Sequence, residues 1–233
     1  MKIGVVGLNG RMSKVIIEEI TNNSDHILSG VLVRNKVDHP TIKLFDNVLE
    51  LMEGSDALID FSNPATSIDI ARALVATNKI LVCGTTGFSE ADFEEFKSYA
   101  INLTSIWSPN MSLGINLLQM LLKIAANKLP KDFDPAIIDI HHASKLDAPS
   151  GTALALADTI KQNAHKEAQI SSLRIGGVPG EHQVIFSSKD EAITLTHQAF
   201  NRSIFAKGAI KACAWGLGKK PGFYSMQDVL SEQ

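Results

Sequence analysis

Apolar runs and amphipathic stretches alternate along the first half of the chain, and this order limits the fold more than any other feature. Five runs, most of them rich in isoleucine, leucine and valine, are strand candidates: residues 2–6, 27–33, 57–61, 80–83 and 104–107. They show little alternation between apolar and polar residues, which is typical of parallel strands covered on both faces. Repeated strand–helix units of this kind predict an α/β domain with a doubly wound parallel sheet.

Helical patterns occupy the stretches between these runs. Residues 11–20 form an amphipathic stretch, and Pro64 suits the first turn of a helix over residues 64–75. Ser89 and Asp92 resemble a capping box, so a helix is expected from this point to about residue 100.

The second half of the chain has a different pattern. The expected helices are residues 113–126, 150–166 and 204–214. The expected strands are residues 136–142, between the first two helices, and residues 184–186 and 192–197, before the last helix. The two neighbouring strand candidates belong to an antiparallel or mixed sheet. The pattern therefore predicts a nucleotide-binding domain to about Pro109, followed by a smaller α+β domain.

Length, composition and charge are those of an ordinary globular protein. The chain has 233 residues, of which 45% are hydrophobic and 20% charged. These values exclude a disordered tail, a collagen-like repeat and a coiled coil. The net charge of −3 does not indicate binding to nucleic acid.

The cysteines and the apolar stretches bear on the compartment. Cys83 and Cys213 are far apart, so no CxxC motif exists and a four-thiolate zinc site is excluded. The first residues are typical of a strand and not of a signal peptide. The longest apolar stretch, residues 115–126, is too short to span a bilayer. We expect a cytoplasmic protein that does not contact membranes.

A glycine-rich turn lies between the first strand and the first helix. Its residues are Gly7, Leu8, Asn9, Gly10, Arg11 and Met12. Glycines at this junction allow the backbone to approach a pyrophosphate, which the helix N-terminus stabilises. The full dinucleotide fingerprint has glycine where Asn9 and Met12 stand, so a simple tight turn is the alternative. Its position at the first strand–helix junction favours cofactor binding.

Arg34 follows the second strand, where an acidic residue would hold the ribose hydroxyls of NAD. A guanidinium group there suits a 2′-phosphate instead, and Lys36 is nearby. This favours NADPH. The alternative is an exposed arginine at the end of a strand.

Small and polar residues also follow the fourth and fifth strands. They are Gly84, Thr85 and Thr86 in one segment and Ser108, Pro109, Asn110 and Met111 in the other. The carboxyl ends of parallel strands form the usual ligand crevice, although each segment is also compatible with an ordinary turn. Nothing near Cys83 is an obvious base, so we do not favour this thiol as a nucleophile.

The densest group of polar residues extends from His141 to Thr152. His141 and His142 are neighbours at the end of a strand, so their side chains point to opposite faces and are not expected to share a metal. No metal site is therefore predicted. Ser150 begins a helix whose N-terminus, together with Lys145, is a candidate carboxylate site. We interpret this group as functional and not as a structural pair of histidines.

The chain resembles the dihydrodipicolinate reductase family over nearly its whole length. The blocks that carry the resemblance are, in order, the glycine turn, CGTTG, SPNMS, HHASKLDAPSGTA, RIGGVPGEH and LTHQAFNRSIFAKGAIKA. The resemblance implies a Rossmann-like nicotinamide-binding domain over residues 1–110 and a substrate-binding and oligomerisation domain over residues 111–201. It also implies that residues from about 202 to 233 return to the first domain, and that the protein is a homotetramer.

The resemblance further implies an activity and roles for individual residues. The reaction is reduction of 4-hydroxy-tetrahydrodipicolinate, a cyclic imine with two carboxylates, in diaminopimelate and lysine biosynthesis, with NADPH or, as the alternative, NADH. His141 is implied as the acid–base group, Lys145 as the proton donor, and His142, Gly151 and Thr152 as substrate contacts. The glycine turn is implied to hold the cofactor phosphates, Arg34 the adenosine end, and the two segments after the fourth and fifth strands the nicotinamide.

Two departures from the family pattern and several rival functions stay open. Some members have an acidic residue where Val33 stands, and some have an aromatic residue where Met111 stands. The stretch from Arg174 to His182 is also compact. Another two-domain reductase, including a cysteine-dependent semialdehyde dehydrogenase, is one rival. A non-catalytic cofactor sensor is the other, and a metal hydrolase fits least.

Overall fold

The computed structural model describes residues 1–35 and 39–231, so Lys36 lies outside the described residues. The chain forms two compact units. Residues 1–112 and 203–233 make up the first unit, and residues 113–202 make up the second. Among the described residues, no helix has the length and apolar character needed to cross a membrane.

The first unit is built on a seven-stranded sheet with the order β11-β6-β5-β4-β1-β2-β3. Its strands are β1 (Lys2–Val6), β2 (Ile27–Leu32), β3 (Leu44–Phe45), β4 (Ala57–Asp60), β5 (Ile80–Cys83), β6 (Thr104–Trp107) and β11 (Gly222–Tyr224). All neighbours are parallel, which confirms the predicted sheet. Because β1 pairs with β2 on one side and with β4 on the other, the strand order reverses at β1. Open α/β sheets bind ligands at the carboxyl ends of the strands beside such a reversal.

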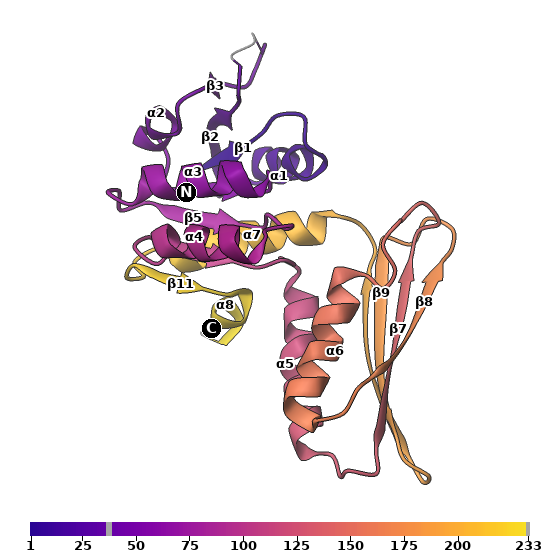
Figure 1. Ribbon diagram of the computed structural model, residues 1–233. Helices are drawn as coiled ribbons and strands as arrows, with labels where there is room; N and C mark the ends of the chain where they lie inside the picture. Colours follow the sequence, from indigo (N-terminus) through magenta and orange to yellow (C-terminus); the bar gives the residue numbers. More distant parts are fainter. Residues whose placement is uncertain (36–38, 232–233) are drawn as a thin grey trace. The chain divides into compact units, whose positions relative to one another are not determined.

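Helices cover both faces of this sheet. They are α1 (Arg11–Thr21), α2 (Val48–Glu53), α3 (Pro64–Leu74), α4 (Glu90–Ala100), α7 (Ser203–Gly216) and α8 (Met226–Ser231). In Figure 1, α3 and α4 lie in front of the strands and α7 lies behind them. α7 packs against α1, β4, β5 and β6, although the whole second unit separates it from β6 along the chain.

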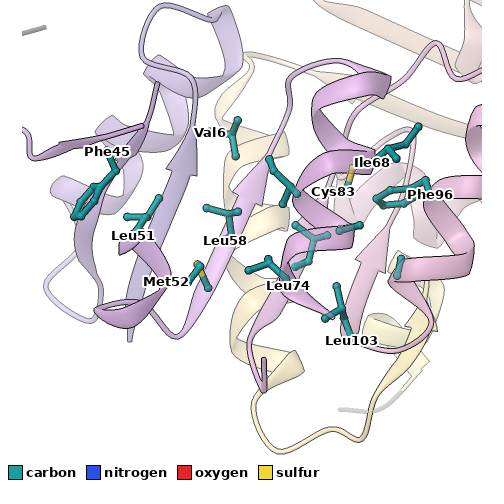
Figure 2. Close-up of a cluster of buried hydrophobic side chains, with 14 residues drawn as sticks. Val6, Phe45, Leu51, Met52, Leu58, Ile68, Leu74, Cys83, Phe96 and Leu103 are labelled. Carbon is teal, nitrogen blue, oxygen red and sulfur yellow. The ribbon is translucent and has the colours of Figure 1, made fainter. Parts of the chain in front are cut away.

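The core on the front face joins α2, α3 and α4 to the strands, as Figure 2 shows. α3 contributes Ile68, Ala71 and Leu74, which lie on one side of the helix because of their three-residue spacing. Phe96 of α4 and Leu58 of β4 are fully buried in the same cluster. Each large side chain buried in this way stabilises the fold by about 1.5–3 kcal/mol.

Side-chain caps determine where two of these helices begin. The Asn63 side chain accepts a hydrogen bond from the Thr66 N–H at 3.1 Å, and Pro64 occupies the first helical position of α3. At α4 the Ser89 hydroxyl accepts from the Asp92 N–H at 3.1 Å and donates to the Asp92 carboxylate at 2.7 Å. The second arrangement confirms the start of the helix predicted from Ser89 and Asp92.

The second unit is a four-stranded sheet with the order β10-β9-β7-β8. Its elements are α5 (Leu113–Lys128), β7 (Asp134–His141), α6 (Gly151–Ala164), β8 (Gln169–Arg174), β9 (Gly180–Ser187) and β10 (Ala192–Ala199). β7 is parallel to β8 and antiparallel to β9, which confirms the predicted mixed sheet. α5 and α6 pack on one face of it (Figure 1), around Leu122, Leu156 and Phe186.

Several short or polar elements do not follow from the sequence pattern. These are β3, α2, β8, β11 and α8. β3 and β11 have two and three residues, so they are too short to show a periodicity. β8 reads QISSLR and lies at the edge of its sheet, where half-exposed serines are tolerated.

Candidate functional site

A cavity of about 890 Å³ lies in the first unit at the carboxyl ends of β1 and β4. It brings together the predicted cofactor residues Gly7, Leu8, Asn9, Gly10 and Arg34. Residues from other elements complete its lining, namely Val6, Leu32, Val33, Asn35, Asp46, Val48, Ser62, Asn63, Thr66, Asp69 and Ile70. Arg11 and Met12, which are both described, continue into α1 and are not part of this lining.

The glycine turn fits a phosphate group. Gly7 has a φ of +80°, which a side chain would disfavour, and its N–H donates to the Leu32 carbonyl at 2.8 Å. Gly10 is the N-cap of α1 and has no side chain with which to bond the N–H groups of the first turn. Ser13 ties the helix to the preceding strand, since its hydroxyl donates to the Val6 carbonyl at 2.9 Å. The first-turn N–H groups of α1 are therefore suited to an anion.

Arg34 supplies a cation to the same cavity. Its side chain is exposed just after the end of β2. The preceding residue, Val33, has no carboxylate and also lines the cavity. Asp46, in the segment between β3 and α2, and Asp69 of α3 contribute acidic groups that the sequence analysis did not select. Neither aspartate directly follows a strand that the sequence pattern predicts, so the sequence does not mark them as cavity residues.

The segments after β5 and β6 are neighbours, because these two strands pair. Trp107 joins them, since its indole N–H donates to the Thr85 carbonyl at 3.2 Å. The buried Thr85 hydroxyl accepts from the Ser62 N–H and from the Ser67 hydroxyl, both at 3.0 Å. The Thr85 side chain thus holds the carboxyl ends of β4 and β5 together.

Other residues of these two segments have packing roles as well. The Phe61 ring packs on Gly84, so a side chain at position 84 would collide with it. The Ser108 hydroxyl donates to the Asn110 carbonyl at 2.8 Å, and Met111 is buried. Thr86 and Pro109 are exposed. The expected contacts of these segments with nicotinamide stay predictions.

The cysteines are not placed for nucleophilic chemistry. Cys83 and Cys213 are 1% and 0% exposed. Burial raises the pKa of both thiols, and the Asp60 carboxylate adds to this effect at Cys83. A reactive cysteine needs the opposite environment, which argues against the cysteine-dependent dehydrogenase.

A polar cluster occupies the carboxyl end of β7 in the second unit. The strand register explains why it forms: Asp139 lies opposite Ser172 of β8 and His182 of β9, and His141 lies opposite Arg174. Asp139 is completely buried, and His141 and His182 are 8% and 4% exposed. Buried charged groups of this kind need partners, and the partners come from three strands and one helix.

The two oxygens of Asp139 have different surroundings. Oδ2 accepts hydrogen bonds from the Ser150 N–H at 3.0 Å, the Ser172 hydroxyl at 3.1 Å and Nη2 of Arg174 at 3.0 Å. Oδ1 faces two imidazoles, with Nδ1 of His141 at 2.8 Å and Nε2 of His182 at 3.4 Å. The contact with His141 is short but lacks the alignment of a hydrogen bond.

The ionisation of these groups follows from their contacts. Burial disfavours the Asp139 carboxylate, but the Ser150 N–H and Arg174 outweigh it and lower its pKa to about 2. Burial lowers the pKa of His182 to about 4, against the attraction of Asp139. Burial also lowers the pKa of His141, with Asp139 again opposing the change. At neutral pH we therefore expect one carboxylate, the Arg174 cation and two neutral imidazoles.

The loop between β7 and α6 carries the other predicted residues. The His142 ring contacts the Ser144 hydroxyl at 2.9 Å, whereas His141 contacts Asp139, so the two histidines do point apart as expected. Nζ of Lys145 lies 2.8 Å from the exposed Asp147 carboxylate. The loop leads to Ser150, and Gly151 and Thr152 then form the first turn of α6.

The α6 N-terminus is capped and linked to the cluster. The Ser150 hydroxyl accepts from the Ala153 N–H at 3.1 Å and lies 3.1 Å from Nε2 of His182. Gly151 is exposed, and open space surrounds the place where a side chain would be. The first turn of α6 can therefore receive a carboxylate.

Asp139 and His182 are cluster members that the sequence analysis left unassigned. Asp139, His141 and His182 have ligand atoms within 4.8 Å of one another, which is the spacing of a metal site. The sequence held two signals for the cluster. Asp139 occupies a buried position in an apolar strand. His182 lies on the same buried side of its strand as Val184 and Phe186.

Comparison with known proteins covers both units. The dihydrodipicolinate reductase N-terminal model matches residues 1–111, and the C-terminal model matches residues 114–230. The chain belongs to the dihydrodipicolinate reductase family. Two similar family members are the 4-hydroxy-tetrahydrodipicolinate reductases of Aquifex aeolicus and Buchnera aphidicola. The first is 38% identical over 99% of this chain and 98% of its own length, and the second is 35% identical over 100% and 97%.

Solved structures show the same fold. A dipicolinate-bound dihydrodipicolinate reductase from Paenisporosarcina superposes with a TM-score of 0.84 at 24% identity, over 98% of both chains. An amine dehydrogenase from Mycobacterium smegmatis has a TM-score of 0.68 at 8% identity, over 97% of this chain and 95% of the other. The family fold therefore extends over both units of this chain.

Proposed function

We propose that this protein reduces 4-hydroxy-tetrahydrodipicolinate to tetrahydrodipicolinate in the biosynthesis of diaminopimelate and lysine. The observation that supports this most strongly is the group of His141, Lys145 and the α6 N-terminus in a member of this family. A nicotinamide nucleotide supplies the hydride when bound. The protein supplies binding, orientation and protons.

The substrate is a dianion and needs positive charge. The first turn of α6 contains Gly151 and Thr152, and the space beside Gly151 is open. Lys145 adds an ammonium group, and His142 adds a ring nitrogen in the same loop. Together these groups suit two carboxylates on a small ring.

Lys145 and His141 are the groups that exchange protons with the substrate. The 4-hydroxyl group leaves the substrate as water, and hydride addition to the resulting conjugated imine leaves excess electron density, which a proton must neutralise. Among the described residues, Nζ of Lys145 pairs only with the exposed Asp147 carboxylate, so it can turn to a substrate. His141 acts as the acid–base group. A positioned proton donor contributes about 10²–10⁴-fold to a rate.

NADPH is the proposed cofactor, with NADH as a weaker substitute. The glycine turn holds the phosphates, and Arg34 binds the 2′-phosphate that distinguishes the two. The lack of a carboxylate at Val33 supports this choice.

We also propose a homotetramer that works in the cytoplasm. α5 and α6 cover one face of the four-stranded sheet, while Ile138, Ile140 and Ile185 point to the other face and are half-buried in the single chain. Half-buried isoleucines on this face, which also carries Gln183 and Glu181, suit contacts between copies of the chain. Light scattering should give four times 25.2 kDa. Ile138→Lys should lower that mass, and an unchanged mass would place the contacts elsewhere.

The activity is tested by a coupled assay. Aspartate semialdehyde and pyruvate are condensed by the upstream synthase, and the protein is added with NADPH or NADH. Cofactor oxidation that needs every component is the expected result, with Lys145→Ala as the negative control. A folded protein that binds NADPH but oxidises none would indicate another substrate or a cofactor sensor.

A further inference from the structure

We propose that Asp139 is a positioning residue for His141, holding one ring nitrogen so that the other is free for proton exchange. The inference rests on the proposed function, in which His141 is the acid–base group. Its basis is the asymmetric set of contacts around the Asp139 carboxylate.

Three donors fix one side of the carboxylate. The Ser150 N–H, the Ser172 hydroxyl and Arg174 all bond Oδ2. Ser150 is the N-cap of α6, and the other two residues belong to β8. The carboxylate therefore cannot rotate without losing several charge-assisted hydrogen bonds. This leaves Oδ1 directed at the imidazoles.

His141 receives its orientation from this oxygen. Nδ1 lies 2.8 Å from Oδ1, and although the two groups are not aligned as a hydrogen bond, the negative charge of Oδ1 favours the neutral tautomer that carries its proton on Nδ1. Nε2 then has a lone pair on the other side of the ring. That side faces Gly180, where an added Cβ would lie 3.1 Å from Nε2. Glycine at this position keeps room beside the reactive nitrogen.

The charges around His141 make Asp139 the stabilising partner of its protonated form. Arg174 of β8 and Lys145 of the loop are cations that disfavour a second positive charge, and burial acts in the same direction. His182 of β9 is neutral at pH 7, because burial lowers its pKa to about 4. Asp139 is the anion that opposes these effects at His141.

The first test is Asp139→Asn, which keeps the shape and removes the charge. We expect kcat to fall about tenfold or more at pH 7, with KM values within about twofold. The limb of the pH profile on which activity falls as the pH rises should move to lower pH. Asp134→Asn is the matched control on the same strand, because this exposed carboxylate pairs with Lys166. Equal kcat losses in both variants would overturn the proposal.

A double-mutant cycle separates positioning from general damage. If Asp139 acts through His141, Asp139→Asn should cost nothing further in a His141→Gln background. The same loss in both backgrounds would show that Asp139 has only a structural role.

A third measurement depends neither on the folding of an Asp139 variant nor on catalytic turnover. Nitrogen-15 NMR of histidine-labelled protein should show His141 protonated on Nδ1 at pH 8, with His141→Gln assigning the signal. The opposite tautomer would overturn the positioning role. If no imine is turned over but this tautomer is found, the proposed function fails and the Asp139–His141 relationship stands.

Discussion

The Ser150 hydroxyl lies 3.1 Å from Nε2 of His182 and also caps α6 through the Ala153 N–H. The Ser150 hydroxyl oxygen therefore contacts both a buried histidine of β9 and the first turn of α6. Charging His182 would disturb both the sheet and the helix N-terminus, so the contact makes the second unit sensitive to acid.

We predict that His182 weakens the protein below pH 6.5. Burial lowers its pKa from 6.5 to about 4, so between these values the unfolded chain binds a proton that the folded chain does not. Stability therefore falls as the pH decreases through this range, by about 3 kcal/mol for this group. Urea midpoints should be measured at several pH values. The slope of the midpoint against pH should be smaller for His182→Gln than for the wild-type protein. His165→Asn, at the exposed end of α6, should keep the wild-type slope. Equal slopes for all three proteins would contradict the assignment.

Lys145→Ala should lower kcat by at least about 100-fold, because the variant lacks the proposed proton donor. NADPH binding, followed by fluorescence titration, should change little. Lys166→Ala is the control, since Lys166 also pairs with a carboxylate in the same unit, at 2.9 Å from Asp134. Unchanged turnover in Lys145→Ala would remove this lysine from the mechanism.

Arg34→Ala should weaken NADPH binding and leave NADH binding nearly unchanged. The proposed contact between the guanidinium and the 2′-phosphate would then be lost, and such a contact contributes about 1.5–3 kcal/mol, or roughly 10–150-fold in Kd. Fluorescence titration with both cofactors measures it. Arg72→Ala, which breaks an ion pair with Glu95 on the surface of the same unit, is the control. An equal loss for both cofactors would argue against a phosphate contact.

Gly208→Ala should destabilise the first unit. A Cβ on Gly208 of α7 would overlap the Met111 carbonyl, so the helix or the segment after β6 must shift. Overpacking of this kind costs about 1–3 kcal/mol or more. Gly54→Ala is the comparison, because open space surrounds Gly54. Urea unfolding should separate the two variants, and similar midpoints would show that α7 adjusts without cost.

Removal of metal ions should leave the activity intact. Asp139, His141 and His182 have the spacing of ligands, but Arg174 already neutralises Asp139 and would repel a divalent cation. Dialysis against chelator, followed by metal analysis and the coupled assay, checks this. A loss that zinc restores would assign the cluster to a metal.

The sequence predicts the long elements well and the polar cluster poorly. The runs at β1 and β5 are apolar enough to be recognised alone, and the glycine turn is placed by its position between β1 and α1. The partnership of Asp139 with His182 depends on the register of β7 and β9. These residues are far apart in sequence, and no local pattern determines which pairs of a sheet face each other.

The first unit is discontinuous, and this sets an order for folding during synthesis. When Arg202 leaves the ribosome, the second unit is complete, whereas the seven-stranded sheet still lacks β11 and its cover of α7. Chains are made at about 5–20 residues per second, so the exposed apolar face of that sheet waits for seconds for its last segment. The nascent chain thus carries its greatest risk of aggregation late, after the second unit can already be folded.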